Sequence, residues 1–169
     1  MTGAELLALA KSALVEAGEA EAEVCATETR RGFARFGGGA INQHKDLVEP
    51  QLVVRVAHGR RVAESATTTA TRAAIVHAIH RAAKAATIVP ETDGFPGFSE
   101  TTAEDADAPP RFVASTANAT AESRVALLEP VLAAIGGAGL VSAGLLETST
   151  SAIARSFSRT SGRPKGFTR

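Results

Sequence analysis

A run of alternating residues between positions 22 and 36 most constrains the fold of this chain. Ala22, Val24 and Ala26 alternate with Glu23, Cys25 and Thr27, and three consecutive glycines at 37–39 follow the run. Period-2 alternation is typical of a strand with one buried face, and glycine supplies the backbone freedom that a tight turn requires. The stretch therefore predicts a long strand that turns back on itself as an antiparallel hairpin.

Three further stretches extend the predicted sheet. Residues 40–48 are interpreted as the return strand, residues 52–56 as a third and most hydrophobic strand, and residues 62–66 as a fourth strand after a turn at 58–60. Together with the first strand, they predict a four-stranded antiparallel meander.

Helical periodicity occurs on both sides of this meander. Residues 4–17 place apolar side chains on one stripe, and the pattern returns after residues 67–69 and continues to Ala86. A third helix is predicted from a cap at Asn118 or Thr120 to the glycines at 136–137. The expected fold class is α+β, with two layers: the meander packed with helices, followed by a helix and the start of a second sheet.

The chain is expected to divide into three parts. Residues 1–87 form a helix-sheet-helix unit, and residues 88–110 form an exposed connection because they contain four prolines, two glycines and six acidic residues without periodicity. Residues 111–169 contain the third helix and a hairpin at 140–158. Because an isolated hairpin is marginally stable in water, this last part is interpreted as the truncated start of a following domain.

Composition argues against several classes of function. The formal net charge is zero, the pI is near 6.9, and aromatic residues make up only 4% of the 169 residues, so nucleic-acid binding is not expected. Cys25 is the only cysteine and cannot form an internal disulfide, and no apolar run is long enough for a spanning helix or a signal segment. A cytoplasmic location and no membrane association are expected.

No residue stands out as catalytic or metal-binding. His77 and His80 share one side of a predicted helix, but no carboxylate or thiol at a neighbouring helical position completes a ligand set. No nucleophile elbow, phosphate loop or dinucleotide fingerprint occurs. The predicted sites are therefore neither catalytic nor metal sites, and no cofactor is expected in this chain.

The first hairpin holds the candidate contact residues for a partner or peptide: Phe33, Arg35, Phe36, Ile41 and His44. On one interpretation, an exposed edge of the meander pairs with an extended peptide or a partner protomer, and the apolar members of this set contact it. On the other, the phenylalanines pack under the two helices. The sequence leaves both interpretations open.

Five stretches in this order resemble a known family: Ala22-Glu23-Val24, residues 34–44, residues 59–68, residues 90–98 and residues 141–154. Residues 34–44 (ARFGGGAINQH) are similar to a hairpin of that family, although His44 stands where the family pattern has Asn. Residues 90–98 (PETDGFPGF) are similar to its proline-rich loop. The chain resembles the N-terminal part of the TldD/PmbA family, also called modulators of DNA gyrase, and more specifically its PmbA-like branch.

The resemblance implies a part in a metallopeptidase family whose members work as paired assemblies in proteolysis. It also implies a protein partner of the same family, as a homo- or hetero-oligomer, and a peptide substrate. The zinc of the active family partner is implied to be held by a His-Glu-x-x-x-His helix in a C-terminal domain, and this chain contains no His-Glu pair. It is therefore expected to be catalytically inactive alone, and a non-enzymatic module that binds protein or peptide through a sheet edge is the alternative.

Overall fold

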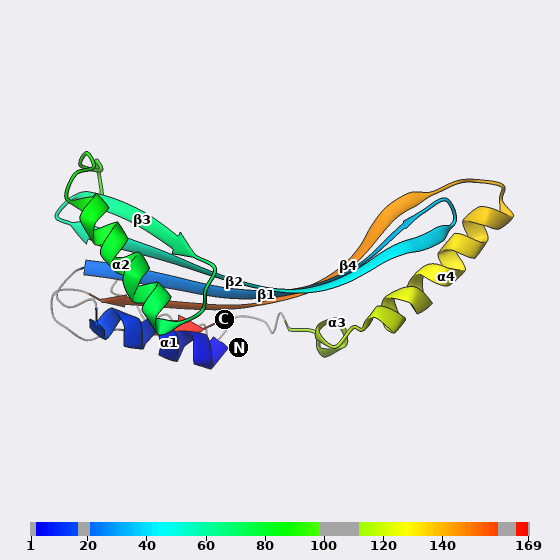
Figure 1. Cartoon of the computed structure of the whole chain (residues 1–169), viewed down its shortest axis with the longest axis horizontal. Helices are drawn as coiled ribbons and strands as arrows, with labels where there is room; N and C mark the ends of the chain where they lie inside the picture. Colours follow the sequence, from blue (N-terminus) through cyan, green and yellow to red (C-terminus); the bar gives the residue numbers. More distant parts are fainter. Residues whose placement is uncertain (1–2, 17–20, 99–111, 159–164, 169) are drawn as a thin grey trace. The chain divides into compact units, whose positions relative to one another are not determined.

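The computed structural model describes residues 3–16, 21–98, 112–158 and 165–168. The elements, labelled in Figure 1, are α1 (Gly3–Glu16), β1 (Glu21–Gly37), β2 (Ala40–His58), β3 (Arg61–Thr67), α2 (Arg72–Ala86), α3 (Ala114–Ala117), α4 (Ala121–Gly137), β4 (Ala143–Ser158) and β5 (Lys165–Thr168). The strands form one sheet in the order β3-β2-β1-β4-β5. The predicted α+β class, with an antiparallel sheet packed with helices, is confirmed.

The predicted break between residues 48 and 52 is wrong, because β2 is one continuous strand. Pro50 lies inside it, just before Leu52, the residue at which pairing with β3 begins. A proline lacks the N–H that a sheet ladder needs, so it is tolerated where a neighbouring strand is missing on one side. The turn at Gly38 and Gly39 is as predicted, and both residues have positive φ, the conformation of tight hairpin turns.

The predicted hairpin at 140–158 and the second sheet it would begin are also wrong. Residues 143–158 form the single strand β4, which is the neighbour of β1 in the same sheet. Residues 145–156 contain neither glycine nor proline, so nothing in the stretch favours a turn. One long strand therefore completes the other side of β1.

The chain forms two compact units, and β1, β2 and β4 contribute residues to both. Unit 1 consists of Met1–Glu28, Pro50–Ala108 and Ala152–Arg169, and unit 2 consists of Thr29–Glu49 and Pro109–Ser151. Each unit is thus assembled from segments that are distant in the sequence.

Unit 1 contains the hydrophobic core. As predicted, α1 and α2 cover one face of the sheet. The core cluster combines α1 (Leu6, Ala10, Ala13, Leu14), α2 (Ile75, Ala78, Ile79, Ala82) and strand residues on one face (Ala22, Val24, Ala26, Leu52, Val54, Val56, Ala154). The alternation in β1 and β2 directs every second side chain to these helices, which is why the side chains on this face are buried from solvent.

The other face of unit 1 carries charged side chains and an aromatic cover. Glu23 forms ion pairs with Arg55 at 3.3 Å and with Arg155 at 3.4 Å. Phe98 is buried, with its ring 5.4 Å from the Arg55 guanidinium carbon and its N–H donating to Glu21. The first part of the predicted loop, residues 88–98, thus contains one buried residue, Phe98. Residues 99–110 of that loop lie outside the described residues.

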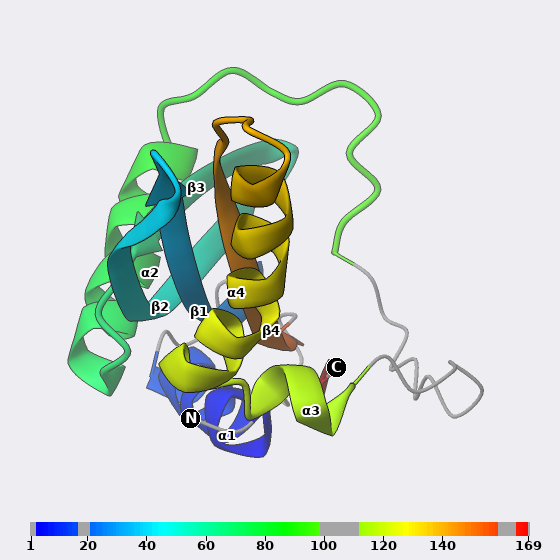
Figure 2. The same ribbon diagram turned by 90° about the vertical axis from the view of Figure 1, so that its right-hand side faces the viewer.

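Unit 2 contains parts of β1, β2 and β4 together with α3 and α4. Among its described residues, only Gly32, Ala34, Arg124 and Leu128 are buried, and none belongs to the hydrophobic core cluster. Of the two predicted caps, Asn118 and Thr120, the second is the one that precedes α4, and its side chain and that of Ser123 form a capping box. Figure 2 shows α4 in front of β4 within this unit.

Candidate functional site

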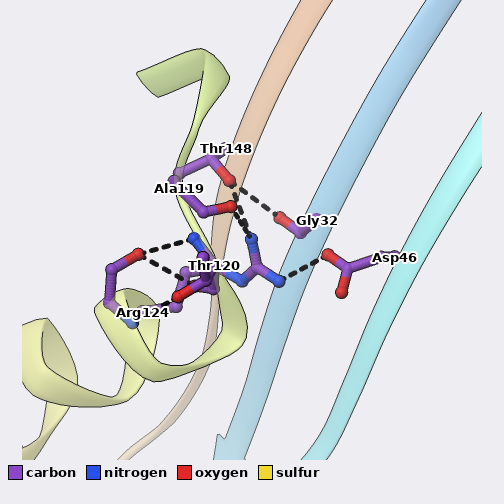
Figure 3. A network of polar contacts seen from close by, with 7 residues as sticks. Gly32, Asp46, Ala119, Thr120, Arg124 and Thr148 are labelled. Atoms are coloured by element: carbon purple, nitrogen blue, oxygen red, sulfur yellow. Dashed lines mark hydrogen bonds and ion pairs between the residues drawn. The ribbon is translucent and has the colours of Figure 1, made fainter. Parts of the chain in front are cut away.

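A buried arginine joins α4 to the three strands of unit 2. The side chain of Arg124 is 1% exposed, and its guanidinium donates to Asp46 on β2 at 2.5 Å and to the Thr148 hydroxyl on β4 at 3.1 Å. It also donates to the carbonyl of Ala119 at 3.3 Å, and Thr148 donates to the carbonyl of Gly32 on β1. Figure 3 shows this network. A charge-assisted contact of this kind is stronger than a neutral hydrogen bond, so Arg124 fixes where α4 lies on the sheet.

Gly32 makes room for this guanidinium. A Cβ at position 32 would overlap the Nη1 atom of Arg124 and lie 2.5 Å from Oδ1 of Asp46. The backbone of Gly32 does not have positive φ, so the glycine is required for space and not for an unusual conformation.

The first turn of α4 carries an acidic residue whose charged form is favoured. The hydrogen bond with the Thr120 side chain and a hydrogen bond with its own backbone lower the pKa of Glu122, and the positive charge of Arg124 lowers it further. A carboxylate at a helix N-terminus also interacts favourably with the helix dipole.

All five predicted contact residues belong to unit 2. Phe33 and Phe36 on β1 and Ile41 on β2 are half-buried, whereas Arg35 and His44 are exposed. The interpretation that the phenylalanines pack under the two helices is wrong, because neither belongs to the core cluster formed with α1 and α2. Their role as partner contacts stays a prediction.

Phe36 has a specific neighbour on β4. A Cβ built at Gly144 would be 2.7 Å from the Cζ atom of the Phe36 ring, so the ring occupies the space above this glycine. An aromatic side chain over a cross-strand glycine helps to fix the register of the two strands. Phe36 therefore aligns β1 with β4 near the end of unit 2.

The exposed apolar side chains of α4 were missed by sequence reasoning. Of the large apolar residues that are exposed in the described part of the chain, all except Val15, Ile88 and Ile153 belong to unit 2. They include Leu127 and Val131 on α4, which are 61% and 48% exposed. A signal was present, because residues 125–141 carry a single charged side chain, and a helix that is apolar on all sides is normally buried.

Two strands of unit 2 have open edges among the described residues. β3 pairs with β2 only from Leu52 to His58, and β5 pairs with β4 only from Ala154 to Phe157. The parts of β2 and β4 that belong to unit 2 are therefore the outer strands on either side of β1. Arg31 of β1 lies between them, with ion pairs to Glu49 at 3.8 Å and to Glu147 at 3.3 Å.

His77 and His80 are both exposed on α2. Within the described ranges, no group of three or more His, Cys, Asp or Glu side chains is placed to hold a metal ion. The same residues include no helix that is long and apolar enough to cross a membrane.

Comparison with known proteins identifies the fold. No family model matches the sequence, and no curated protein matches it. Solved structures do match: TldE from Thermococcus kodakarensis superposes with a TM-score of 0.66 at 15% identity, over 99% of this chain and 42% of that chain.

Two structures described as candidate modulators of DNA gyrase match as well. The protein from Thermotoga maritima gives a TM-score of 0.61 at 14% identity over 98% of this chain, and the protein from Bacteroides thetaiotaomicron gives 0.67 at 11% identity over 98%. The chain spans only 36% and 38% of their lengths. The resemblance to the TldD/PmbA family is thus confirmed at the level of the fold, and this chain has the fold of a part of TldE and of the candidate gyrase modulators.

Proposed function

We propose that the chain is the N-terminal, non-catalytic part of a TldD/PmbA-type protein and serves a proteolytic assembly by binding a protein partner. The observation that carries this proposal is the match to TldE, which covers 99% of this chain and 42% of that one. Nearly all of this chain thus has a counterpart, while more than half of TldE has none here. A cytoplasmic location is part of the proposal.

The proposal includes the statement that the chain by itself has no catalytic activity. Zinc-dependent hydrolysis needs a metal held by about three fixed protein ligands, which lowers the pKa of a bound water. In the described part of the chain, the two neighbouring histidines, His77 and His80, lie exposed on α2 without a third donor beside them. The zinc of the assembly is proposed to belong to the active partner of the family.

The test measures metal content and hydrolysis together. The purified chain is incubated with zinc, dialysed, analysed by mass spectrometry for metal, and assayed with a mixture of unstructured peptides. Substoichiometric zinc and no cleavage are expected. Stoichiometric zinc that is lost in the His77→Ala/His80→Ala variant, or cleavage that a chelator stops, contradicts the proposal.

A second candidate function is a non-enzymatic module that binds protein or peptide through a sheet edge. The observation that favours it is the concentration of exposed apolar side chains in unit 2. Phe33→Ser tests the predicted contact set, because this half-buried residue lies outside the hydrophobic core. Loss of partner binding with an unchanged circular dichroism spectrum supports the module, and loss of folding contradicts a contact role for Phe33.

A further inference from the structure

We infer that a pocket between α2 and the end of β3 binds a small organic phosphate, that is, a phosphate group carried by an organic molecule of modest size. The inference goes beyond the proposed function, because the ligand is neither a protein partner nor a peptide. All residues that carry it belong to unit 1, the unit that contains the hydrophobic core.

The pocket lies where β3 ends and α2 contacts this strand (Figure 1). It is open to solvent and has a volume of about 500 Å³. Residues 66–68 line it from the end of β3, and the residues that line it from α2 are Ala74, His77 and Arg81. Sites for small molecules typically have volumes of about 300–1,000 Å³. A phosphate group and the organic group that carries it therefore fit together in this space.

The pocket contains a cation that is held in place without an anionic partner. The Nη2 atom of Arg81 donates to the carbonyl of Ala66 at 2.9 Å, which holds the guanidinium against β3. In the described part of the chain, Arg81 forms no ion pair with a carboxylate. By contrast, carboxylates pair with five other arginines: Arg31, Arg55, Arg60, Arg124 and Arg155. A guanidinium has five N–H donors, so the bond to one carbonyl leaves donors for an anion.

Further hydrogen-bond donors line the same pocket. His77 is four residues before Arg81, so the two side chains are neighbours on one side of α2. The Thr67 hydroxyl accepts the N–H of Thr69 at 3.1 Å and donates to no acceptor among the described residues, which leaves its O–H for a ligand. Thr68 adds a second hydroxyl. Guanidinium, imidazole and hydroxyl groups thus meet at one cavity from a helix and from the end of a strand.

The sequence around the pocket is free of negative charge. No acidic residue occurs between Glu64 and Glu91, whereas this stretch contains two arginines, one lysine and two histidines. The whole chain has a formal net charge of zero, so the excess of positive charge is local to this stretch. An anion in the pocket therefore meets no carboxylate from α2 or from the segment that joins it to β3.

The donors suit a phosphate better than a carboxylate. A carboxylate has two oxygens, which the fork of one guanidinium already satisfies. A phosphate monoester has three acceptor oxygens, so the guanidinium, the imidazole and the hydroxyls all find an acceptor. Nucleic acid is disfavoured, because its backbone requires several cations along its length and the pocket supplies one guanidinium. The methyl groups of Ala66 and Ala74 offer apolar contact to the organic group.

The test measures the binding of phenyl phosphate to the full chain by isothermal titration calorimetry in about 150 mM salt, which screens non-specific attraction. A Kd below about 1 mM is expected. Two comparison ligands separate the two parts of the molecule, because benzoate places a carboxylate on the same ring and inorganic phosphate lacks the ring. Both are expected to bind at least about tenfold more weakly, equivalent to about 1.4 kcal/mol.

Two matched pairs of variants on α2 locate the site. Arg81→Gln is expected to weaken the binding of phenyl phosphate at least about tenfold. Lys84→Gln removes the same charge from an exposed residue that does not line the pocket, and it should change the affinity less than about threefold. His77→Gln and the control His80→Gln form the second pair, with the same order of effects. All four side chains are exposed, and circular dichroism verifies that the helix is retained.

Three results overturn the inference: no binding of phenyl phosphate, equal affinity for benzoate or inorganic phosphate, or equal effects of the two variants within each pair. If Arg81→Gln does not fold, the histidine pair decides. A single-stranded oligonucleotide that binds more tightly than phenyl phosphate, and that Arg81→Gln releases, overturns it in favour of nucleic acid.

Discussion

The two units hold their helices on the sheet in different ways. In unit 1, α2 alone contributes five buried side chains, whereas in unit 2 α4 contributes only two, Arg124 and Leu128. Unit 1 therefore depends on apolar burial, which is non-directional and tolerant of small shifts. Unit 2 depends on one guanidinium with directed partners, which specifies a position but buries little apolar area. The difference accounts for why exposed apolar residues accumulate in unit 2.

The largest difference between the units is expected from leucine truncation. Leu52→Ala removes a fully buried side chain in the unit 1 core and should lower the free energy of unfolding by about 2–5 kcal/mol. Leu127→Ala, the matched truncation in unit 2, should change it by less than about 0.5 kcal/mol because this side chain is 61% exposed. Urea unfolding followed by far-ultraviolet circular dichroism measures both. Equal costs would refute the contrast between the units.

The next effect is expected from the space at Gly32. Gly32→Ala should displace the Arg124 guanidinium and destabilise unit 2 by about 1–3 kcal/mol, the range for leaving buried polar groups unpaired. Hydrogen exchange should become faster in α4, while the exchange of Leu52–Val56 stays unchanged. Gly136→Ala is the control, because nothing lies within 4 Å of a Cβ there. Uniform destabilisation of both units would show that the network is not local to unit 2.

A smaller effect is expected from the two helix caps. Thr71 accepts a hydrogen bond from the N–H of Ala74 in α2, and Thr120 accepts one from the N–H of Ser123 in α4, each at 3.3 Å. Replacement of either threonine by alanine should cost about 1 kcal/mol. Because α2 is anchored by its buried residues, Thr71→Ala should lower global stability, whereas Thr120→Ala should chiefly accelerate hydrogen exchange in α4. The same exchange pattern in both variants would contradict this distinction.

The smallest effect concerns pH. The pKa of Glu122 is lower in the folded state than in the unfolded chain, so its contribution to stability is present above the unfolded pKa of about 4.3. That contribution is lost as the pH falls through the lower, folded value. Glu122→Gln should therefore destabilise α4 at neutral pH and have no effect at the acidic end of a titration. An equal effect of the substitution at neutral and at acidic pH would exclude a role for the negative charge of Glu122.

The sequence predicted the elements that depend on local pattern. The alternation in β1, the glycine turn after it, and the periodicity of the three long helices each reflect which neighbours in the sequence share a face. These features are found in the folded structure because the spacing of apolar residues along each helix or strand determines which of its faces is buried. The approximate bounds of α1, α2 and α4 were predictable for this reason.

The sequence did not predict the features that depend on distant partners. Pro50 suggested a break in β2, yet its cost depends on whether β3 lies beside it, and β3 begins to pair only at Leu52. The position of Arg124 within a helix gave no sign of burial, because Asp46 is 78 residues away and Thr148 is on a later strand. The candidate contact residues of the first hairpin belong to unit 2. The open edge of β4 was not predicted, because that strand was interpreted as a hairpin.

The strand order also has a consequence during synthesis. β1 is completed by residue 37 and can pair with β2 at once, but its other neighbour, β4, begins only at residue 143. Ribosomes add about 5–20 residues per second, so this central strand emerges with one side unpaired for several seconds. The alternating apolar residues of β1 are exposed on the nascent chain during that interval. Slower translation before residue 143 should therefore increase the amount of insoluble product, and faster translation should decrease it.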